Sequence, residues 1–104
     1  MIEPVLISGP PSSGKTTRMN EILDNYAQMD ILRINFQAFK VRSKINLKEF
    51  FKVVAIEEVT TLTDIVYCAD VFKKYGLPMI ITTQEDTKYF SEEFLSAFEL
   101  IILP

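Results

Sequence analysis

Short apolar runs recur along the chain, and each predicts a β-strand. Runs that are apolar at nearly every position suit strands with both faces covered, whereas alternation suits a strand with one wet face. Residues 31–36 alternate, with Leu32, Ile34 and Phe36 on one side, so they predict a strand at the edge of a sheet. Continuous apolar character predicts buried strands at residues 5–8, 53–56, 79–82 and 100–103.

Apolar residues at helical spacing predict helices between these strands. One helix follows Gly14, and a short one spans residues 91–98 with Ser91 as its N-cap. A longer helix ends at Gly76, and its expected core face holds Leu62, Ile65, Val66, Ala69, Phe72 and Tyr75. Residues 37–50 are less regular, with one short helix near 47–51. The pattern predicts a three-layer α/β/α fold with a mostly parallel five-stranded sheet, in one domain of residues 1–104.

Composition narrows the chemistry. The chain has 104 residues and a net charge of −3, so bulk charge gives no argument for nucleic acid or a membrane. The absence of histidine removes the commonest general base and the usual zinc ligand. Cys68, the only cysteine, fits a core position. The first residues lack the features of a signal peptide and no run is long enough to span a bilayer, so we expect a cytoplasmic protein.

The strongest motif lies between the first predicted strand and the first helix. It matches G-x-x-x-x-G-K-[ST] at every fixed position, and predicts a loop whose backbone N–H groups surround phosphate oxygens. Lys15 would bridge the β- and γ-phosphates, and Thr16 would offer its hydroxyl to Mg²⁺. The expected nucleotide-binding residues are Gly9, Pro10, Pro11, Ser12, Ser13, Gly14, Lys15, Thr16 and Thr17.

Two adjacent acids, Glu57 and Glu58, follow the run at residues 53–56. The carboxyl ends of parallel strands share one sheet edge, so this pair should lie beside the phosphate loop. We assign Glu57 to the Mg²⁺ shell and Glu58 to the attacking water. An ordinary acidic turn is the alternative interpretation.

With these motifs the chain resembles the AAA+ and superfamily 3 helicase group of ATPases, which carry a catalytic glutamate. Their Walker B motif ends in Asp-Glu, and this chain has Glu-Glu. The resemblance implies a sensor-1 strand ending at Gln84, where asparagine is usual, so that an amide could hold the γ-phosphate or the attacking water. It also implies that the first strand lies between the last strand and the sensor-1 strand. Ala97 stands where the family places an arginine finger, and the family's helical lid would not fit before Pro104.

The segment 33–52 is basic, with four phenylalanines interleaved. Cations with aromatic rings can hold single-stranded nucleic acid. The interpretation we prefer is a solvated loop whose phenylalanines return to the core. The basic residues are Arg33, Lys40, Arg42, Lys44, Lys48 and Lys52, and the rings are Phe36, Phe39, Phe50 and Phe51.

Taken together, the sequence predicts an ATP-binding protein with slow Mg²⁺-dependent hydrolysis, with Lys15, Glu58 and Gln84 as catalytic residues. Hydrolysis could be coupled to single-stranded nucleic acid, through the basic segment, or to a partner protein. A partner or a second copy would have to supply an arginine finger. Two alternatives remain open. One is a small nucleotide or metabolite kinase, although only three arginines are present to clamp a phosphoryl group. The other is a nucleotide-binding module that no longer hydrolyses.

Overall fold

The computed structural model describes residues 3–104, so Met1 and Ile2 of the expected 1–104 domain lie outside the described residues. The strands are β1 (Val5–Ser8), β2 (Ile31–Asn35), β3 (Val53–Glu57), β4 (Met79–Thr83) and β5 (Glu99–Ile102). The α-helices are α1 (Lys15–Leu23), α2 (Phe36–Arg42), α3 (Leu62–Tyr75) and α4 (Glu92–Leu95), and short 3₁₀ turns lie at Gln28–Asp30, Leu47–Glu49 and Thr87–Tyr89. Within residues 3–104, no helix combines the length and the apolar character needed to cross a membrane.

All five strands form one parallel sheet in the order β2-β3-β4-β1-β5. The prediction that β1 lies between the last strand and the strand ending near Gln84 is therefore confirmed, as is the edge position of β2. The buried strand predicted at residues 100–103 is wrong: β5 spans Glu99–Ile102 at the opposite edge, where it pairs with β1 and where Glu99 and Ile102 are exposed. Register pairs Ser8 of β1 with Thr83 of β4, so the carboxyl ends of the two strands finish level. The loop after β1 and the turn after β4 consequently share one edge of the sheet.

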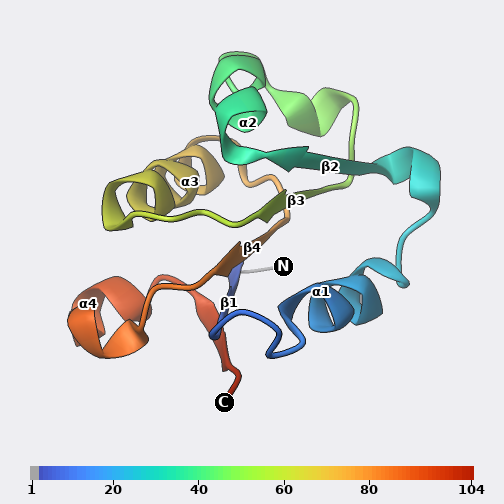
Figure 1. Cartoon of the computed structure of the whole chain (residues 1–104). Coiled ribbons are helices and arrows are strands. Elements are labelled where there is room, and N and C mark those ends of the chain that lie inside the picture. The colour runs from blue at the N-terminus through green and yellow to red at the C-terminus, as the bar shows by residue number, and fades with distance from the viewer. Residues whose placement is uncertain (1–2) are drawn as a thin grey trace.

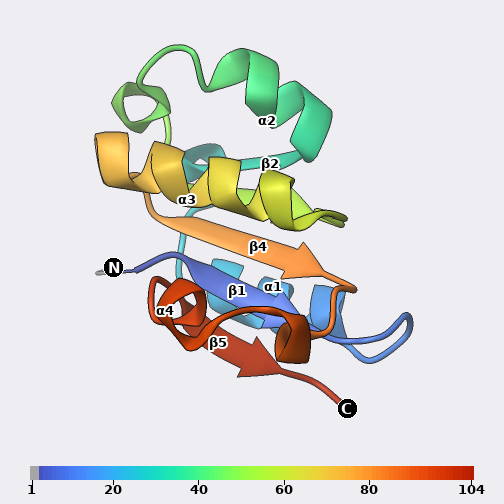
Figure 2. The ribbon, with the colours of Figure 1, turned by 90° about the vertical axis from the view of Figure 1, so that its left-hand side faces the viewer.

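Helices cover both faces of the sheet, as Figure 1 shows. Helix α1 lies on one face, where Met19 and Leu23 pack with Val5 and Ile7 of β1. Helices α2, α3 and α4 lie on the other face, and Figure 2 views the molecule from their side. Leu6 points to that second core, so alternate residues of β1 feed the two layers of apolar packing. The three-layer α/β/α prediction is confirmed.

Helix α2 corrects the prediction of irregular structure at residues 37–50. The expected strand 31–36 ends one residue early, and Phe36 opens the helix. The side chain of Asn35 accepts a hydrogen bond from the Ala38 N–H at 2.9 Å, which caps the helix. The physical reason is topological: β2 and β3 are parallel neighbours, and a parallel pair needs a crossover that places a helix over the sheet. Phe36 and Phe39 then reach the core together.

Two helix predictions need smaller corrections. Helix α4 has the expected cap, since Ser91 Oγ accepts from the Phe94 N–H at 3.1 Å, but it ends at Leu95 rather than 98. Helix α3 ends at Gly76 with φ +67°, as predicted. Leu62 and Val66, expected on its core face, are exposed, because the buried stripe of α3 is narrower and centres on Ile65, Cys68 and Ala69.

Candidate functional site

The loop from Gly9 to Thr16 leaves β1 and enters α1. It surrounds a hollow of about 310 Å³ lined by Ser12, Gly14, Lys15, Thr16 and Thr17. Ser12 has φ +62° and Gly14 has φ +95°, so the loop turns by two left-handed steps. Such conformations occur in loops whose N–H groups surround an anion. A Cβ on Gly14 would meet no atom within 4 Å, so its conformation, rather than crowding, calls for glycine there.

Lys15 is buried, and its ammonium group is held by the loop itself. Nζ donates to the carbonyl oxygen of Gly9 at 2.8 Å and to that of Pro10 at 2.9 Å. Both partners are neutral carbonyls. A phosphate oxygen would be a stronger, charge-assisted acceptor, so the ammonium group can exchange these partners for a phosphate.

Ser13 carries a buried hydroxyl within the loop. Its Oγ is buried and has no hydrogen-bond partner among the described residues. A buried hydroxyl without a partner is costly, and such groups usually mark a missing ligand contact or stored strain. Ser13 does not line the hollow, and a Cβ on Gly9 would lie 2.5 Å from its Oγ, so this hydroxyl faces Gly9. The fit of a phosphate depends instead on Lys15, whose ammonium group donates to neutral carbonyl oxygens that a phosphate can replace.

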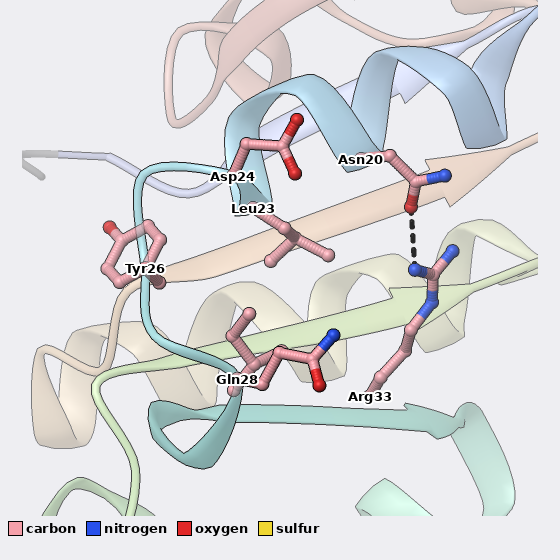
Figure 3. A pocket seen from close by; sticks show the side chains of 7 residues that line it. Asn20, Leu23, Asp24, Tyr26, Gln28 and Arg33 are labelled. Atoms are coloured by element: carbon pink, nitrogen blue, oxygen red, sulfur yellow. Dashed lines mark hydrogen bonds between the residues drawn. The ribbon is translucent and has the colours of Figure 1, made fainter.

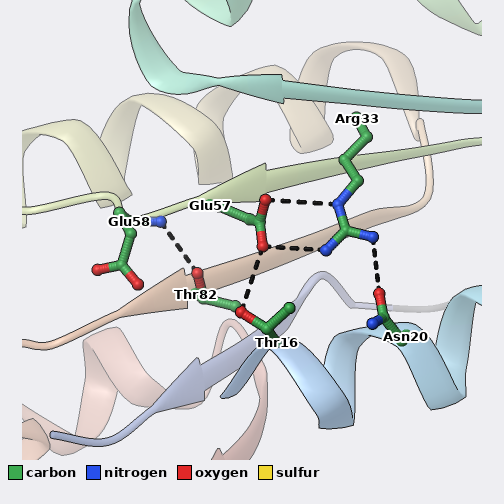
Figure 4. Close-up of polar contacts among 6 residues, drawn as sticks. All are labelled: Thr16, Asn20, Arg33, Glu57, Glu58 and Thr82. Atoms are coloured by element: carbon green, nitrogen blue, oxygen red, sulfur yellow. Dashed lines mark hydrogen bonds and ion pairs between the residues drawn. The ribbon is translucent and has the colours of Figure 1, made fainter. Parts of the chain in front are cut away.

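Four side chains form a continuous polar chain beside the loop (Figure 4). Thr16 Oγ1 donates to Glu57 Oε1 at 3.5 Å. Arg33 donates to the same carboxylate through Nη2 to Oε1 at 3.0 Å and Nε to Oε2 at 3.4 Å. Its Nη1 also donates to Asn20 Oδ1 at 2.6 Å. Thr16 and Asn20 are four residues apart on α1 and therefore share a face of the helix.

These hydrogen bonds bring together the two residues assigned to Mg²⁺, Thr16 and Glu57. Hydroxyl and carboxylate oxygens suit Mg²⁺, which normally keeps water and phosphate oxygens for the rest of its shell. Within residues 3–104, no group of three or more carboxylates, thiols and imidazoles could hold a metal unaided. The residues present therefore fit a metal that arrives with a phosphate ligand.

Glu58 and Gln84 also lie close together, where β3 and β4 end. Gln84 Nε2 donates to Glu58 Oε2 at 3.0 Å. Glu58 has φ +55°, an uncommon conformation for a residue other than glycine, and its N–H donates to Thr82 Oγ1 at 3.0 Å. The end of β4 therefore fixes both the backbone and the carboxylate of Glu58.

Sequence reasoning missed three residues of this site: Arg33, Asn20 and Thr82. Arg33 was counted with the basic segment, although its position on the wet face of β2 is a signal that it faces α1. Asn20 lies one turn after Thr16, a spacing that could have been noticed. Thr82 was treated only as part of an apolar strand.

The basic segment separates into a buried part and an exposed part. Phe36 and Phe39 return to the core, as the preferred interpretation expected. Phe50 is 63% exposed, and the Arg42 guanidinium lies over the ring of Phe51 at 5.8 Å. These residues line a hollow of about 380 Å³ with Val41, Ile45 and Leu47.

Ala97 lies between α4 and β5 and packs against the core on the α3 side of the sheet. Cys68 is fully buried, as expected, and burial raises the pKa of its thiol from 9.0 to about 12. A thiol with so high a pKa is a poor nucleophile at neutral pH.

The five-stranded parallel sheet with helices on both faces matches an AAA+ ATPase-like core. No protein-family model and no curated protein matches the sequence. Solved structures do: one is AMPPCP-bound DnaA from Aquifex aeolicus, with TM-score 0.56 and 14% identity over 99% of this chain and 41% of that one. Another is C. elegans PCH-2, with TM-score 0.60 and 16% identity over 100% of this chain and 36% of that one. The chain thus spans less than half the length of either, and identities this low establish the fold alone.

Proposed function

We propose that this chain binds ATP in the loop of residues 9–16 and hydrolyses it slowly with Mg²⁺, as one nucleotide-binding domain. The observation that carries the proposal is the meeting of Thr16 with Glu57, and of Glu58 with Gln84, at the sheet edge where the loop lies. The AMPPCP-bound state of DnaA, whose fold is similar, supports a nucleotide as the ligand.

In this proposal the loop holds the phosphates and its side chains orient them. Lys15 leaves the carbonyl oxygens of Gly9 and Pro10 and donates to the β- and γ-phosphate oxygens. The N–H groups of the loop donate to the same chain of phosphates. Thr16 and Glu57 would hold Mg²⁺, which when bound would neutralise charge on the β- and γ-phosphates.

Hydrolysis then requires a water and a base. As the water oxygen bonds to the γ-phosphorus, Glu58 accepts the proton that the water loses. The bond from the γ-phosphorus to the bridging oxygen breaks, and that electron pair leaves with ADP. Gln84 keeps the Glu58 carboxylate in place through its amide N–H.

The rate should be low for the chain alone. An arginine finger contributes roughly 10³–10⁵ in rate, and Ala97 stands where the resembled family has one. We propose that a partner protein or a second copy supplies this group.

Phosphate release from Mg·ATP, together with equilibrium nucleotide binding, tests the proposal. Lys15→Ala should weaken binding about a hundredfold, since charge-assisted hydrogen bonds to phosphate are lost. Glu58→Gln should keep binding and abolish release. Lys73→Ala and Glu93→Gln are matched controls, because both side chains are exposed on α3 and α4.

The outcomes separate the alternatives. Nucleotide affinity unchanged in Lys15→Ala would refute the proposal. Tight binding without release by the wild type would instead identify a non-hydrolysing module, and transfer of the phosphoryl group to an added metabolite would identify a kinase.

Coupling to single-stranded nucleic acid is a second candidate, favoured by the exposed ring of Phe50, which lines a hollow together with Arg42. Single-stranded DNA should then raise phosphate release, and Phe50→Ala should remove this stimulation while leaving the basal rate unchanged. Absence of stimulation in the wild type would exclude this role.

A further inference from the structure

Arg33 holds the carboxylate of Glu57 at both oxygens. Its Nη2 donates to Oε1 at 3.0 Å and its Nε to Oε2 at 3.4 Å, in the forked geometry that suits a guanidinium and a carboxylate. Asn20 fixes the third nitrogen at 2.6 Å. The guanidinium is therefore anchored between α1 and β3 rather than free in solvent (Figure 4).

The contact involves one particular oxygen of Glu57. Oε1 accepts from Arg33 and also from Thr16 Oγ1, at 3.5 Å. A metal ion held by Thr16 and Glu57 would approach the same oxygen. A guanidinium and a divalent cation repel each other, and both cannot lie against one oxygen at full strength.

We propose that the guanidinium of Arg33 competes with Mg²⁺ for the carboxylate of Glu57. Arg33 thereby determines how strongly the affinity for nucleotide depends on the metal. This inference rests on the proposed nucleotide function. Without Mg²⁺, the guanidinium supplies positive charge beside the phosphates, and nucleotide still binds. With Mg²⁺, part of the binding energy of the metal is used to displace the guanidinium from Oε1.

A displaced Arg33 side chain has space to occupy. It lines a hollow of about 510 Å³ between α1 and β2, whose walls include Leu23, Tyr26 and Ile31 (Figure 3). Asp24 also lines this hollow and offers a carboxylate to a guanidinium that turns away from Glu57.

The test measures metal coupling at equilibrium, without turnover. The dissociation constant of a fluorescent, non-hydrolysable ATP analogue is measured in EDTA and in excess MgCl₂. The coupling is the constant in EDTA divided by the constant in MgCl₂. Arg33→Gln should raise this ratio about tenfold, the effect of one unit charge a few ångströms from a partly exposed metal. Most of the rise should come from weaker binding in EDTA.

Two controls separate charge from shape. Arg33→Lys keeps the positive charge, so its ratio should stay near that of the wild type. Arg18→Gln removes an exposed arginine of α1 whose ion pair is with Glu21 at 3.9 Å, and it should leave the ratio unchanged. Circular dichroism of each variant confirms that the fold is retained.

The results decide between the proposals. An unchanged or lower ratio in Arg33→Gln overturns the competition, and so does an equal rise in Arg33→Lys. A wild type that binds no nucleotide overturns the proposed function as well. Normal nucleotide binding that needs Lys15, together with an unchanged ratio in Arg33→Gln, overturns the role of Arg33 alone.

Discussion

Replacing Gly9 by alanine perturbs the tightest contact of the phosphate loop. A Cβ there would lie 2.5 Å from Ser13 Oγ, 3.1 Å from Leu103 Cβ and 3.3 Å from the Leu103 carbonyl oxygen. The hydroxyl of Ser13 can rotate, but Leu103 is held by its own N–H, which donates to the Ser8 carbonyl oxygen at 2.8 Å. The new methyl group must therefore push the end of β5 away from the loop.

The magnitude follows from two opposing effects. Overpacking of this kind lowers the free energy of unfolding by roughly 1–3 kcal/mol. Alanine also restricts the unfolded chain, which raises the free energy of unfolding by about 0.4–1 kcal/mol. We expect Gly9→Ala to be destabilising by about 1–2 kcal/mol, or a shift of about 1 M in the urea midpoint.

A double-mutant cycle with Ser13→Ala isolates the 2.5 Å contact. Ser13→Ala alone should change the free energy of unfolding by less than about 0.5 kcal/mol, because its hydroxyl has no partner among the described residues. In that background Gly9→Ala should cost about 0.5–1 kcal/mol less than it does in the wild type.

Gly14→Ala is the matched control for this cycle. Its Cβ would meet no atom within 4 Å, so its cost of about 1–2 kcal/mol comes from φ +95°. That cost should be the same with and without the Ser13 hydroxyl. Urea unfolding followed by circular dichroism gives all the values. A cost of Gly9→Ala that does not depend on Ser13 would refute the steric reasoning.

Three further predictions concern the core and α2. Cys68 should react with a thiol reagent only as fast as the protein unfolds, because burial raises the pKa of its thiol from 9.0 to about 12. The thiol of the unfolded chain loses its proton at a lower pH than the buried thiol does. The contribution of Cys68 to the free energy of unfolding should therefore be complete below pH 9.0 and should decline as the pH rises toward about 12. A urea midpoint that does not decrease between these pH values would contradict the prediction. Asn35→Ala should lower the free energy of unfolding by about 1 kcal/mol through loss of the α2 cap, whereas Asn35→Ser should restore most of it in the same urea assay.

Local patterns made much of the fold predictable. The run from Val53 and the helical spacing that ends at Gly76 each depend on residues a few positions apart, and the structure has both elements where they were expected. The cap at Ser91 is likewise a local signal. Helix α2 was missed because Asn35 fits an alternating strand as well as it fits an N-cap, and only the pairing of β2 with β3 decides between them.

The sequence by itself predicts which residues would hold a phosphate, because G-x-x-x-x-G-K-[ST] is a contiguous pattern whose chemistry does not depend on distant residues. It also predicts that β1, β3 and β4 are buried, but it is wrong about β5, which lies at an edge of the sheet with Glu99 and Ile102 exposed. Tertiary structure alone decided that Arg33 holds Glu57, 24 positions away, and that Thr16 reaches the same carboxylate across 41 positions. The reason is physical: the register of neighbouring strands and the placement of α1 decide which side chains meet. Neither can be predicted from residues that are close in the sequence.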